Sequence, residues 1–209
     1  KYLFSTKDAD GFLKEGKAYF MGEELFEVEK LKIFGHHNYR NALASAIIAK
    51  LMGVSSETVR ETLYEFPGLP LRLEFLGEWN GVKVFNDSKA TTVNALESAL
   101  KSMPDKSVIL IAGGRDKGGD FESIYDLVVQ KVRIAILIGE AKDKIFQAWR
   151  GSTVLEKAES LEEAVKMAKA YSQKGDVILF SPACASFDMF KDYIERGERF
   201  RELIYSLFE

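Results

Sequence analysis

Three short stretches rich in Gly, Ser, Thr, Asp and Lys carry the residues that could do chemistry. They are residues 86–92, 113–120 and 181–188, and each follows an apolar, strand-like run. Backbone N–H groups, hydroxyls and cations at the end of a strand can converge on an anion. The chemistry that these residues indicate is recognition of phosphate or carboxylate groups.

The third stretch begins the segment Ser-Pro-Ala-Cys-Ala-Ser-Phe-Asp-Met-Phe at residues 181–190. Ser181 or Ser186 could offer a hydroxyl to an anion, although a plain strand-to-helix connection would have the same composition. Cys184 has small apolar neighbours and no partner nearby, which favours a buried structural thiol over a nucleophile.

The first stretch places a carboxylate and an amine at a strand end, at Asp87 and Lys89. Asp87 could accept hydrogen bonds from a ribose, and Lys89 could neutralise phosphate. Alternatively, the two side chains form an ion pair that caps the next helix. Arg72 could pack its stem along apolar surface or clamp a phosphate.

The second stretch, Gly-Gly-Arg-Asp-Lys-Gly-Gly at residues 113–119, does not match the dinucleotide pattern G-x-G-x-x-G. It sets Arg115 and Lys117 among glycines, which suits the binding of a carboxylate or phosphate close to backbone amides. A flexible, solvated loop is the alternative.

The first third of the chain offers two amides and two patterns that we reject. Asn38 is a candidate N-cap, and Asn41 follows one turn later, so the two amides could share one end of a helix. Adjacent His36 and His37 have no acidic residue at ligand spacing, so no metal site is predicted. Residues 11–18 nearly spell the phosphate-binding loop, but they lack its final hydroxyl and precede a strand-like run, which predicts a hairpin.

The helices and strands that position these residues are predicted from hydrophobic periodicity and turn signals. Residues 1–68 predict a β-meander and two helices, at about 42–52 and 55–65. Two prolines and a glycine at 66–70 predict a domain junction. Beyond it, Asn80-Gly81 predicts a hairpin between strands at 71–79 and 82–85, and a helix is expected to run from the first stretch to about 102.

The remaining chain alternates short apolar strands with helices. Strands are predicted at 108–112, 134–138, 153–155 and 177–180, and helices at about 121–131, 141–149, 160–172 and 187–207. Residues 160–163 form a capping box. The alternation predicts an α/β fold with a Rossmann-like, doubly wound, mostly parallel sheet, in which ligands bind beyond the carboxyl ends of the strands.

Composition limits the classes of protein. The 209 residues are 46% hydrophobic and 29% charged, with a net charge of −3, which is typical of a folded chain and gives no electrostatic argument for nucleic acid. One cysteine excludes an intrachain disulfide and fits a cytoplasmic location. No run is long enough to span a bilayer, and no signal peptide is visible. The chain begins without Met in a strand-like run, so we expect a fragment of a longer protein.

Five segments together resemble the Mur ligase family, ATP-dependent amide-bond-forming enzymes of peptidoglycan synthesis. The segments are His37-Asn-x-x-Asn41, Gly68-Leu-Pro-x-Arg72, Asn86-Asp-Ser-Lys-Ala-Thr91, Gly113-Gly-x-x-Lys117-x-x-Asp-Phe121 and Ser181-Pro-Ala-Cys-Ala-Ser-Phe-Asp-x-Phe190. The last is similar to the branch that adds D-glutamate to UDP-N-acetylmuramoyl-L-alanine. The resemblance implies that residues 1–68 are the tail of the central ATP-binding domain and 69–209 a Rossmann-like amino-acid-binding domain.

The resemblance also implies roles for individual residues. ATP would be bound by Asn38, Asn41, Arg72, Asp87 and Lys89. D-glutamate would be bound by Thr91, Lys117, Ser186, Phe187 and Tyr193, with Lys117 as the catalytic residue. Tyr193 stands where the family often has Phe, which puts the selectivity of that contact in doubt.

Departures from the family pattern limit what this chain is expected to do alone. A true phosphate-binding loop, the family's modified Mg²⁺-binding lysine and the sugar-nucleotide domain have no counterpart in the sequence. ATP and Mg²⁺ are therefore expected to bind mainly through other parts of the polypeptide, and the isolated chain is expected to be inactive. Two alternatives remain: a folylpolyglutamate synthase-like ligase and a non-catalytic module that binds an amino acid or nucleotide.

Overall fold

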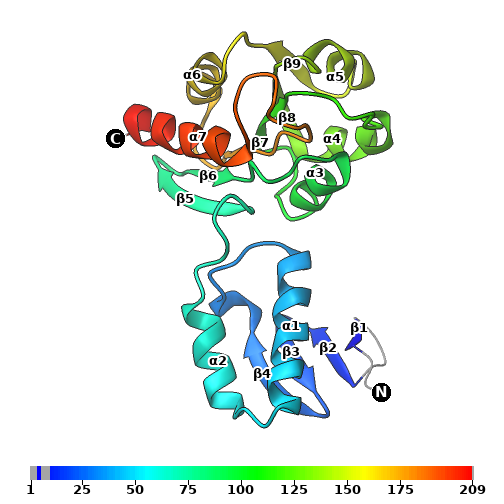
Figure 1. The fold of residues 1–209 in the computed structure, drawn as a ribbon, viewed down its shortest axis with the longest axis vertical. Coiled ribbons are helices and arrows are strands. Elements are labelled where there is room, and N and C mark those ends of the chain that lie inside the picture. Colours follow the sequence, from blue (N-terminus) through cyan, green and yellow to red (C-terminus); the bar gives the residue numbers. More distant parts are fainter. Residues whose placement is uncertain (1–3, 6–9, 209) are drawn as a thin grey trace. The chain divides into compact units, whose positions relative to one another are not determined.

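The computed structural model describes residues 4–5 and 10–208, and the chain divides into two compact units, Lys1–Gly68 and Leu69–Glu209 (Figure 1). The division falls inside the Pro-Gly-Leu-Pro segment at 67–70. Gly68 has a φ of +91°, which an L side chain rarely adopts. Prolines on either side remove backbone donors, so neither helix nor sheet continues through this segment.

The first unit contains a four-stranded sheet in the order β1-β2-β3-β4. Its strands are β1 (Phe4–Ser5), β2 (Gly11–Lys14), β3 (Lys17–Phe20) and β4 (Glu23–Glu27). The meander is confirmed for β2, β3 and β4, which pair antiparallel, whereas β1 runs parallel to β2. Part of the strand expected near the N-terminus lies outside the described residues.

A hairpin, not a phosphate-binding loop, occupies residues 11–18. Leu13 pairs with Ala18 and Lys14 with Lys17 across the turn. Glu15 and Gly16 at its tip both have positive φ, 49° and 76°, which is the conformation of a tight two-residue turn.

Helices η1 (Val28–Lys30), α1 (His36–Leu51) and α2 (Ser56–Glu65) follow the sheet. The prediction for α2 is confirmed, since the Ser55 hydroxyl accepts a hydrogen bond from Thr58 N–H. The prediction that Asn38 caps α1 is wrong. Gly35 is the N-cap, and Asn38 lies inside the first turn, where its Nδ2 donates to Phe34 O at 2.8 Å.

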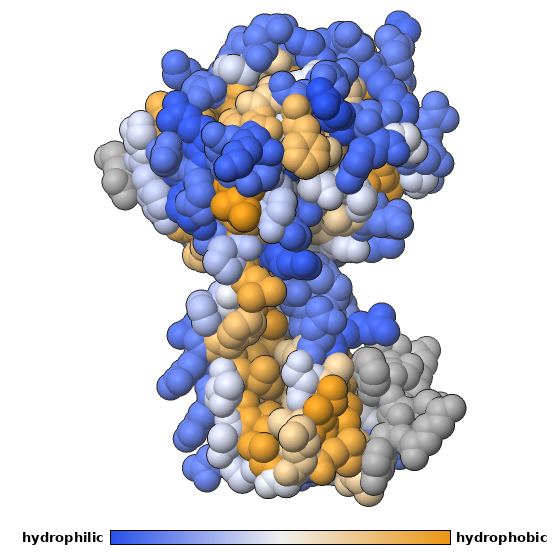
Figure 2. Space-filling view, in the orientation of Figure 1, coloured by the Kyte–Doolittle hydropathy of each residue, from blue (hydrophilic) through white to orange (hydrophobic). Residues whose placement is uncertain are grey.

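The core of this unit lies between the sheet and the two α-helices. It is formed by Ala18, Phe20, Leu25, Phe26, Leu31, Ala42, Leu43, Ala46, Ile47 and Val59. Apolar side chains also gather on the surface of this unit, in contrast with the mostly hydrophilic face of the second unit in Figure 2. Ile48 is 59% exposed and Met52 is 80% exposed. Within residues 4–5 and 10–208, no helix is long and apolar enough to cross a membrane.

The second unit is built on a six-stranded sheet in the order β5-β6-β10-β7-β8-β9. The strands are β5 (Glu74–Trp79), β6 (Val82–Asn86), β7 (Val108–Gly113), β8 (Val132–Ile138), β9 (Val154–Lys157) and β10 (Val177–Phe180). All neighbours pair parallel except the edge hairpin β5–β6. The predicted Asn80-Gly81 turn is confirmed, and both residues have the positive φ that such a turn requires.

Helices cover both faces of this sheet, as the doubly wound prediction requires. They are α3 (Val93–Leu100), η2 (Glu122–Ile124), α4 (Tyr125–Lys131), α5 (Lys142–Ala148), α6 (Leu161–Tyr171) and α7 (Tyr193–Phe208). α6 and α7 pack together on one face, whereas α3, α4 and α5 lie on the other (Figure 1). The Ser160 half of the capping box is confirmed, since Ser160 Oγ accepts from Glu163 N–H at 3.1 Å; the Glu163 carboxylate accepts from Glu159 N–H, one residue before the N-cap.

The last helix begins later than the sequence pattern indicates. The prediction placed its start near 187, but α7 begins at Tyr193. Asp192 Oδ1 accepts hydrogen bonds from the N–H groups of Ile194 and Glu195, at 2.9 and 2.8 Å. This carboxylate caps the helix, so residues 187–192 belong to the loop although their apolar residues continue the pattern.

Candidate functional site

The strand order brings the three candidate stretches to one edge of the sheet. β10 lies between β6 and β7, and Phe180 pairs with Asn86 on one side and Ile111 on the other. Because these strands are parallel, residues 86–92, 113–120 and 181–188 leave neighbouring strands at the same end. The register therefore places the three loops at one edge of the sheet, as the sequence predicts.

Backbone hydrogen bonds join the three loops to one another. Asp87 N–H donates to Phe180 O at 2.8 Å, and Gly113 N–H donates to Pro182 O at 2.8 Å. Arg115 and Ala185 exchange two hydrogen bonds, at 2.9 and 3.0 Å. The loop after β10 is therefore held from both sides by the loops after β6 and β7.

Asp87 uses both carboxylate oxygens within the protein. Oδ1 accepts from Leu73 N–H at 3.0 Å, and Oδ2 accepts from the Ser181 hydroxyl at 2.9 Å. The residue is 8% exposed, and burial raises its pKa to about 7, against the lowering effect of those hydrogen bonds and of the Arg72 charge. The ion-pair cap considered for Asp87 and Lys89 is not formed, because Thr92 caps α3 through its hydroxyl.

Lys89 lies against an aromatic ring at the start of α7. Its Nζ is 3.8 Å from the centroid of the Tyr193 ring, which is a close cation–π contact. Tyr193 is the first residue of α7, and its carbonyl accepts a hydrogen bond from the Ser88 hydroxyl at 2.8 Å. Thr91 is half-buried two residues after Lys89. These contacts join residues 86–92 to the start of α7.

The glycine-rich loop after β7 is ordered by its own carboxylate. Asp116 Oδ1 accepts from the N–H groups of Gly118 and Gly119, and Oδ2 pairs with Lys144 at 2.6 Å. Arg115 makes two hydrogen bonds to Glu140, at 3.1 and 2.9 Å, so this cation is already paired.

Lys117 is exposed in the same loop and has no hydrogen-bond or ion-pair partner in residues 4–5 and 10–208. Its neighbour Arg115 is neutralised by Glu140, as described above. Lys117 therefore supplies the positive charge of this loop that is available to an anion.

The loop after β10 contains two serines, which differ in their surroundings although the sequence alone does not distinguish them. Ser181 is buried and its hydroxyl donates to Asp87, whereas Ser186 is 2% exposed and its carbonyl accepts hydrogen bonds from Met189 and Phe190 N–H. Cys184 is 1% exposed, and burial raises the pKa of its thiol to about 12. The prediction of a buried structural thiol is confirmed, and of the two serines only Ser181 uses its hydroxyl in a hydrogen bond to Asp87.

Phe187 and Tyr193 place aromatic rings beside this loop. Phe187 is 62% exposed, and Tyr193 is half-buried under Lys89.

Arg196 joins the loops from within α7 and was missed by sequence reasoning. It is fully buried, and it donates to Ser88 Oγ at 3.2 Å, Ser88 O at 2.9 Å and Cys184 O at 3.1 Å. Burial lowers its pKa to about 10, so it remains charged at neutral pH. Its Nη1 and the Oδ1 of Asp188 have no partner among the described residues. An arginine among charged residues of a helix is ordinarily exposed, so no signal in the sequence marks it.

The predicted nucleotide-binding residues occur in both units. Asn38 and Asn41 lie in the first two turns of α1, with Asn41 exposed, as expected for amides near one helix end. Arg72 is exposed in the second unit and lies close enough to Asp87 to lower the pKa of that carboxyl. The alternative in which the Arg72 stem is buried along apolar surface is not supported by this exposure.

The residues at the strand ends offer few side chains that could ligate a metal ion. Within residues 4–5 and 10–208, no cluster of three or more His, Cys, Asp or Glu side chains could hold a metal ion. Two of the carboxylates at the strand ends, Asp87 and Asp116, each already accept two hydrogen bonds from other residues through groups that include backbone N–H. These residues suit an anionic ligand better than a divalent cation.

The strand ends of this doubly wound α/β domain thus carry hydroxyls, aromatic rings and Lys117, which has no partner among the described residues. The family model described as "Mur ligase, glutamate ligase domain" matches residues 71–184. The chain belongs to the Mur ligase family, which confirms the resemblance described from its motifs.

Curated relatives carry the name UDP-N-acetylmuramoylalanine–D-glutamate ligase. The protein from Aquifex aeolicus is 50% identical over 204 residues, which are 98% of this chain and 48% of the relative. The protein from Latilactobacillus sakei is 42% identical over 98% of this chain and 45% of its own length. The chain thus spans about half the length of the curated relatives it matches.

Solved structures show the same fold at low sequence identity. MurC from Thermotoga maritima has a TM-score of 0.69 at 19% identity, covering 99% of this chain and 48% of that one. MurF from the same organism, solved with ADP, has a TM-score of 0.69 at 17% identity, covering 98% and 48%. A folylpolyglutamate synthase from Mycobacterium tuberculosis reaches 0.62 at 14% identity, covering 92% and 46%. The fold class predicted from the sequence is confirmed.

Proposed function

We propose that the protein containing this chain is an ATP-dependent ligase that joins D-glutamate to UDP-N-acetylmuramoyl-L-alanine in peptidoglycan synthesis. The observation that carries the proposal is the 50% identity over nearly the whole chain to a relative named as a D-glutamate ligase. The folylpolyglutamate synthase alternative has only fold-level similarity at 14% identity, which does not favour it.

In this proposal, the second unit holds the incoming amino acid. Lys117 binds a carboxylate of D-glutamate, and the hydroxyls of Ser186 and Thr91 donate hydrogen bonds to its carboxylates. Phe187 and Tyr193 contact the apolar part of the amino acid. The exposure of Lys117 and its lack of a protein partner among the described residues support this assignment.

ATP is assigned to residues of both units. Asn38 and Asn41 bind the adenine, and Asp87 binds the ribose through the lone pairs that its two hydrogen bonds leave free. Arg72 and Lys89 face the phosphates, where their positive charges compensate the negative charge of ATP. Mg²⁺ does not fit the donor set described above, so no step through Mg²⁺ is assigned to this chain.

The proposed reaction has two steps. The γ-phosphoryl group of ATP is transferred to the substrate carboxylate, which gives an acyl phosphate and ADP. The amine of D-glutamate then attacks the acyl carbon; the C–N bond forms, phosphate leaves through a tetrahedral intermediate, and the amine loses a proton. By fixing both carboxylates, this chain orients the amine for the second step.

The reaction is proposed to be cytoplasmic. The first unit of this chain is proposed to be part of a larger ATP-binding domain. The exposed Ile48 and Met52 support this assignment, because apolar patches on a small unit are typical of surfaces that pack against further protein. The chain's coverage of about half of each relative supports it as well.

A phosphate-release assay tests the proposed function. The full-length protein should release phosphate from ATP when D-glutamate and UDP-N-acetylmuramoyl-L-alanine are both present, and the isolated chain should not. L-glutamate in place of D-glutamate is the matched control. Release that does not depend on D-glutamate, or turnover by the isolated chain, would contradict the proposal.

A further inference from the structure

Arg72 lies between two buried leucines whose backbones are left-handed. The φ angles of Leu71 and Leu73 are +63° and +46°, and each residue is 3% exposed, while Arg72 between them is exposed. This conformation is disfavoured for L-residues because Cβ approaches the following carbonyl oxygen. Such a backbone persists only where its surroundings hold it in place.

Three hydrogen bonds join Leu71 and Leu73 to Glu74 and to the loop after β6. Leu71 N–H donates to Glu74 Oε2 at 3.0 Å, and Lys89 N–H donates to Leu71 O at 3.1 Å. Leu73 N–H donates to Asp87 Oδ1 at 3.0 Å. The backbone on either side of Arg72 is thus fixed to Glu74 and to the loop that carries Asp87 and Lys89.

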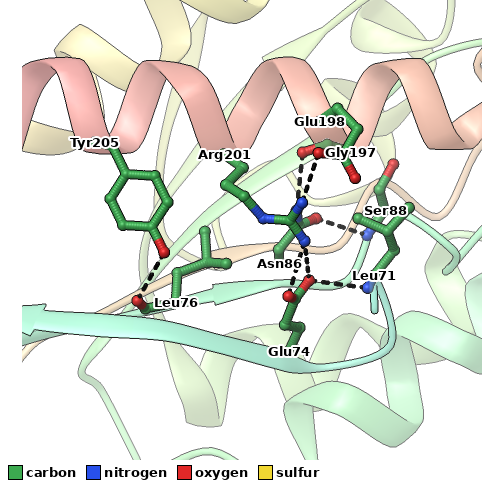
Figure 3. A network of polar contacts seen from close by, with 9 residues as sticks. All are labelled: Leu71, Glu74, Leu76, Asn86, Ser88, Gly197, Glu198, Arg201 and Tyr205. Carbon is green, nitrogen blue, oxygen red and sulfur yellow. Dashed lines mark hydrogen bonds and ion pairs between the residues drawn. The ribbon is translucent and has the colours of Figure 1, made fainter. Parts of the chain in front are cut away.

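Glu74 is in turn held by α7. Arg201 Nη2 lies 2.8 Å from each carboxylate oxygen of Glu74, and its Nη1 lies 2.5 Å from Glu198 Oε2 (Figure 3). Both side chains of the Arg201–Glu74 pair are 24% exposed. Glu74 Oε2 therefore accepts from both Arg201 and Leu71 N–H, which connects the helix to the backbone next to Arg72 (Figure 3).

A glycine on α7 completes this arrangement. A Cβ at Gly197 would lie 2.5 Å from Leu71 Cδ2 and 3.0 Å from Ser88 Cβ, so the helix approaches Leu71 more closely than a side chain would permit. The Gly197 carbonyl also accepts from Asn86 Nδ2 at 2.9 Å (Figure 3). Gly197 is one turn from Arg201, so two successive turns of α7 act on the Leu71–Glu74 corner.

We propose that Arg201 and Glu74 are positioning residues for Arg72, so that α7 determines where this cation is presented. The proposal rests on the proposed function, in which Arg72 faces the phosphates of ATP. Neither Arg201 nor Glu74 needs to contact a substrate, because both act through the backbone on either side of Arg72.

The test is a double-mutant cycle in the full-length protein, with Arg72→Ala, Arg201→Met and the double variant. We expect Arg201→Met to raise KM for ATP about 10-fold and to leave KM for D-glutamate within about 2-fold. The double variant should be no worse than Arg72→Ala alone, since Arg201 acts through Arg72. Losses that multiply, or equal increases in both KM values, would overturn the proposal.

Arg199→Met is the matched control. Arg199 lies on the same helix and pairs with Glu162 and Glu202, away from the Leu71–Glu74 corner. Its replacement should leave KM for ATP unchanged. If Arg201→Met folds poorly, Arg201→Lys takes its place. Lysine keeps the charge but loses the planar fork, so we expect a smaller increase in KM for ATP.

Amide hydrogen exchange separates this proposal from the proposed function. If the unsubstituted protein shows no ATP-dependent turnover, the proposed function fails, but exchange at Leu71 can still be compared among variants. Faster exchange at Leu71 in Arg201→Met than in Arg199→Met supports the positioning role. Equal exchange in the two variants overturns it, whatever the activity.

Discussion

The Ser181 hydroxyl donates a hydrogen bond to Asp87 Oδ2 at 2.9 Å, across 94 positions of sequence. Ser181 begins the loop after β10, and Asp87 begins the loop after β6, so this bond joins two of the three loops that carry the candidate site. The Ser181 hydroxyl is therefore bound within the protein, and Ser186 is the serine whose hydroxyl we propose for a ligand.

The pKa of Asp87 predicts a specific pH dependence of stability. Burial raises this pKa to about 7, well above the ordinary value of an aspartate. The contribution of this group to stability is therefore fully present below pH of about 4 and is lost as the pH rises through about 7. Asp87→Asn removes the titration, and the fall in unfolding free energy between pH 5 and 8.5 should shrink by about 2 kcal/mol.

Urea denaturation at several pH values measures this effect. Asp126→Asn is the control, because Asp126 is an exposed carboxylate on α4. An unchanged pH dependence in Asp87→Asn would show that another group is responsible.

Arg196 is expected to contribute strongly to the stability of the second unit. Arg196→Met removes three hydrogen bonds and leaves the carbonyls of Ser88 and Cys184 without that donor. Stability should fall by about 2–4 kcal/mol, measured by chemical denaturation. Arg199→Met, an exposed arginine on the same helix, should change stability by less than about 1 kcal/mol. Similar losses in both variants would contradict the role assigned to Arg196.

Lys117 should matter for the amino acid more than for the nucleotide. In the full-length protein, Lys117→Ala should raise KM for D-glutamate about 10- to 100-fold and change ATP affinity by less than about 2-fold, because a charge-assisted contact to one substrate is lost. Lys101→Ala is the control, since Lys101 is 61% exposed and pairs with Glu97 on α3. Equal loss for both substrates would show that Lys117 is misassigned.

The contact between Lys89 and Tyr193 should depend on the ring and not on the hydroxyl. Tyr193→Phe keeps a face for the Lys89 ammonium, whereas Tyr193→Leu removes it. We expect Tyr193→Leu to lower stability by about 1 kcal/mol more than Tyr193→Phe, measured by thermal unfolding. In Lys89→Gln this difference should disappear; if it persists, packing of the ring and not the cation accounts for it.

Local signals predicted most of the fold. The Asn80-Gly81 turn, the Ser55 cap and the Ser160 cap occur where the sequence places them, because each depends on groups only a few residues apart. The predicted start of α7 and the predicted cap of α1 were wrong, because local signals there pointed to other residues than those that cap the helices. Asp192 and Gly35 cap these helices, while the apolar pattern and Asn38 suggested other positions.

The candidate site was only partly visible in the sequence. Motifs identified Lys117, Ser186 and Thr91, and periodicity predicted that their loops follow parallel strands. The burial of Arg196 could not be predicted, because arginine among charged residues of a helix is normally solvated. Its burial depends on carbonyl groups of two loops that only the folded chain brings together.

By itself, the sequence determined the class of fold, the family and the residue types at the strand ends, since these follow from periodicity and short motifs. Tertiary structure alone decided which of these groups are already used. Ser181 is bound to Asp87, Arg115 to Glu140 and Glu74 to Arg201, whereas Lys117 has no partner in the described part of the chain. The physical reason is that a hydrogen bond or ion pair depends on distance in space, and the strand order that sets those distances comes from packing the whole sheet.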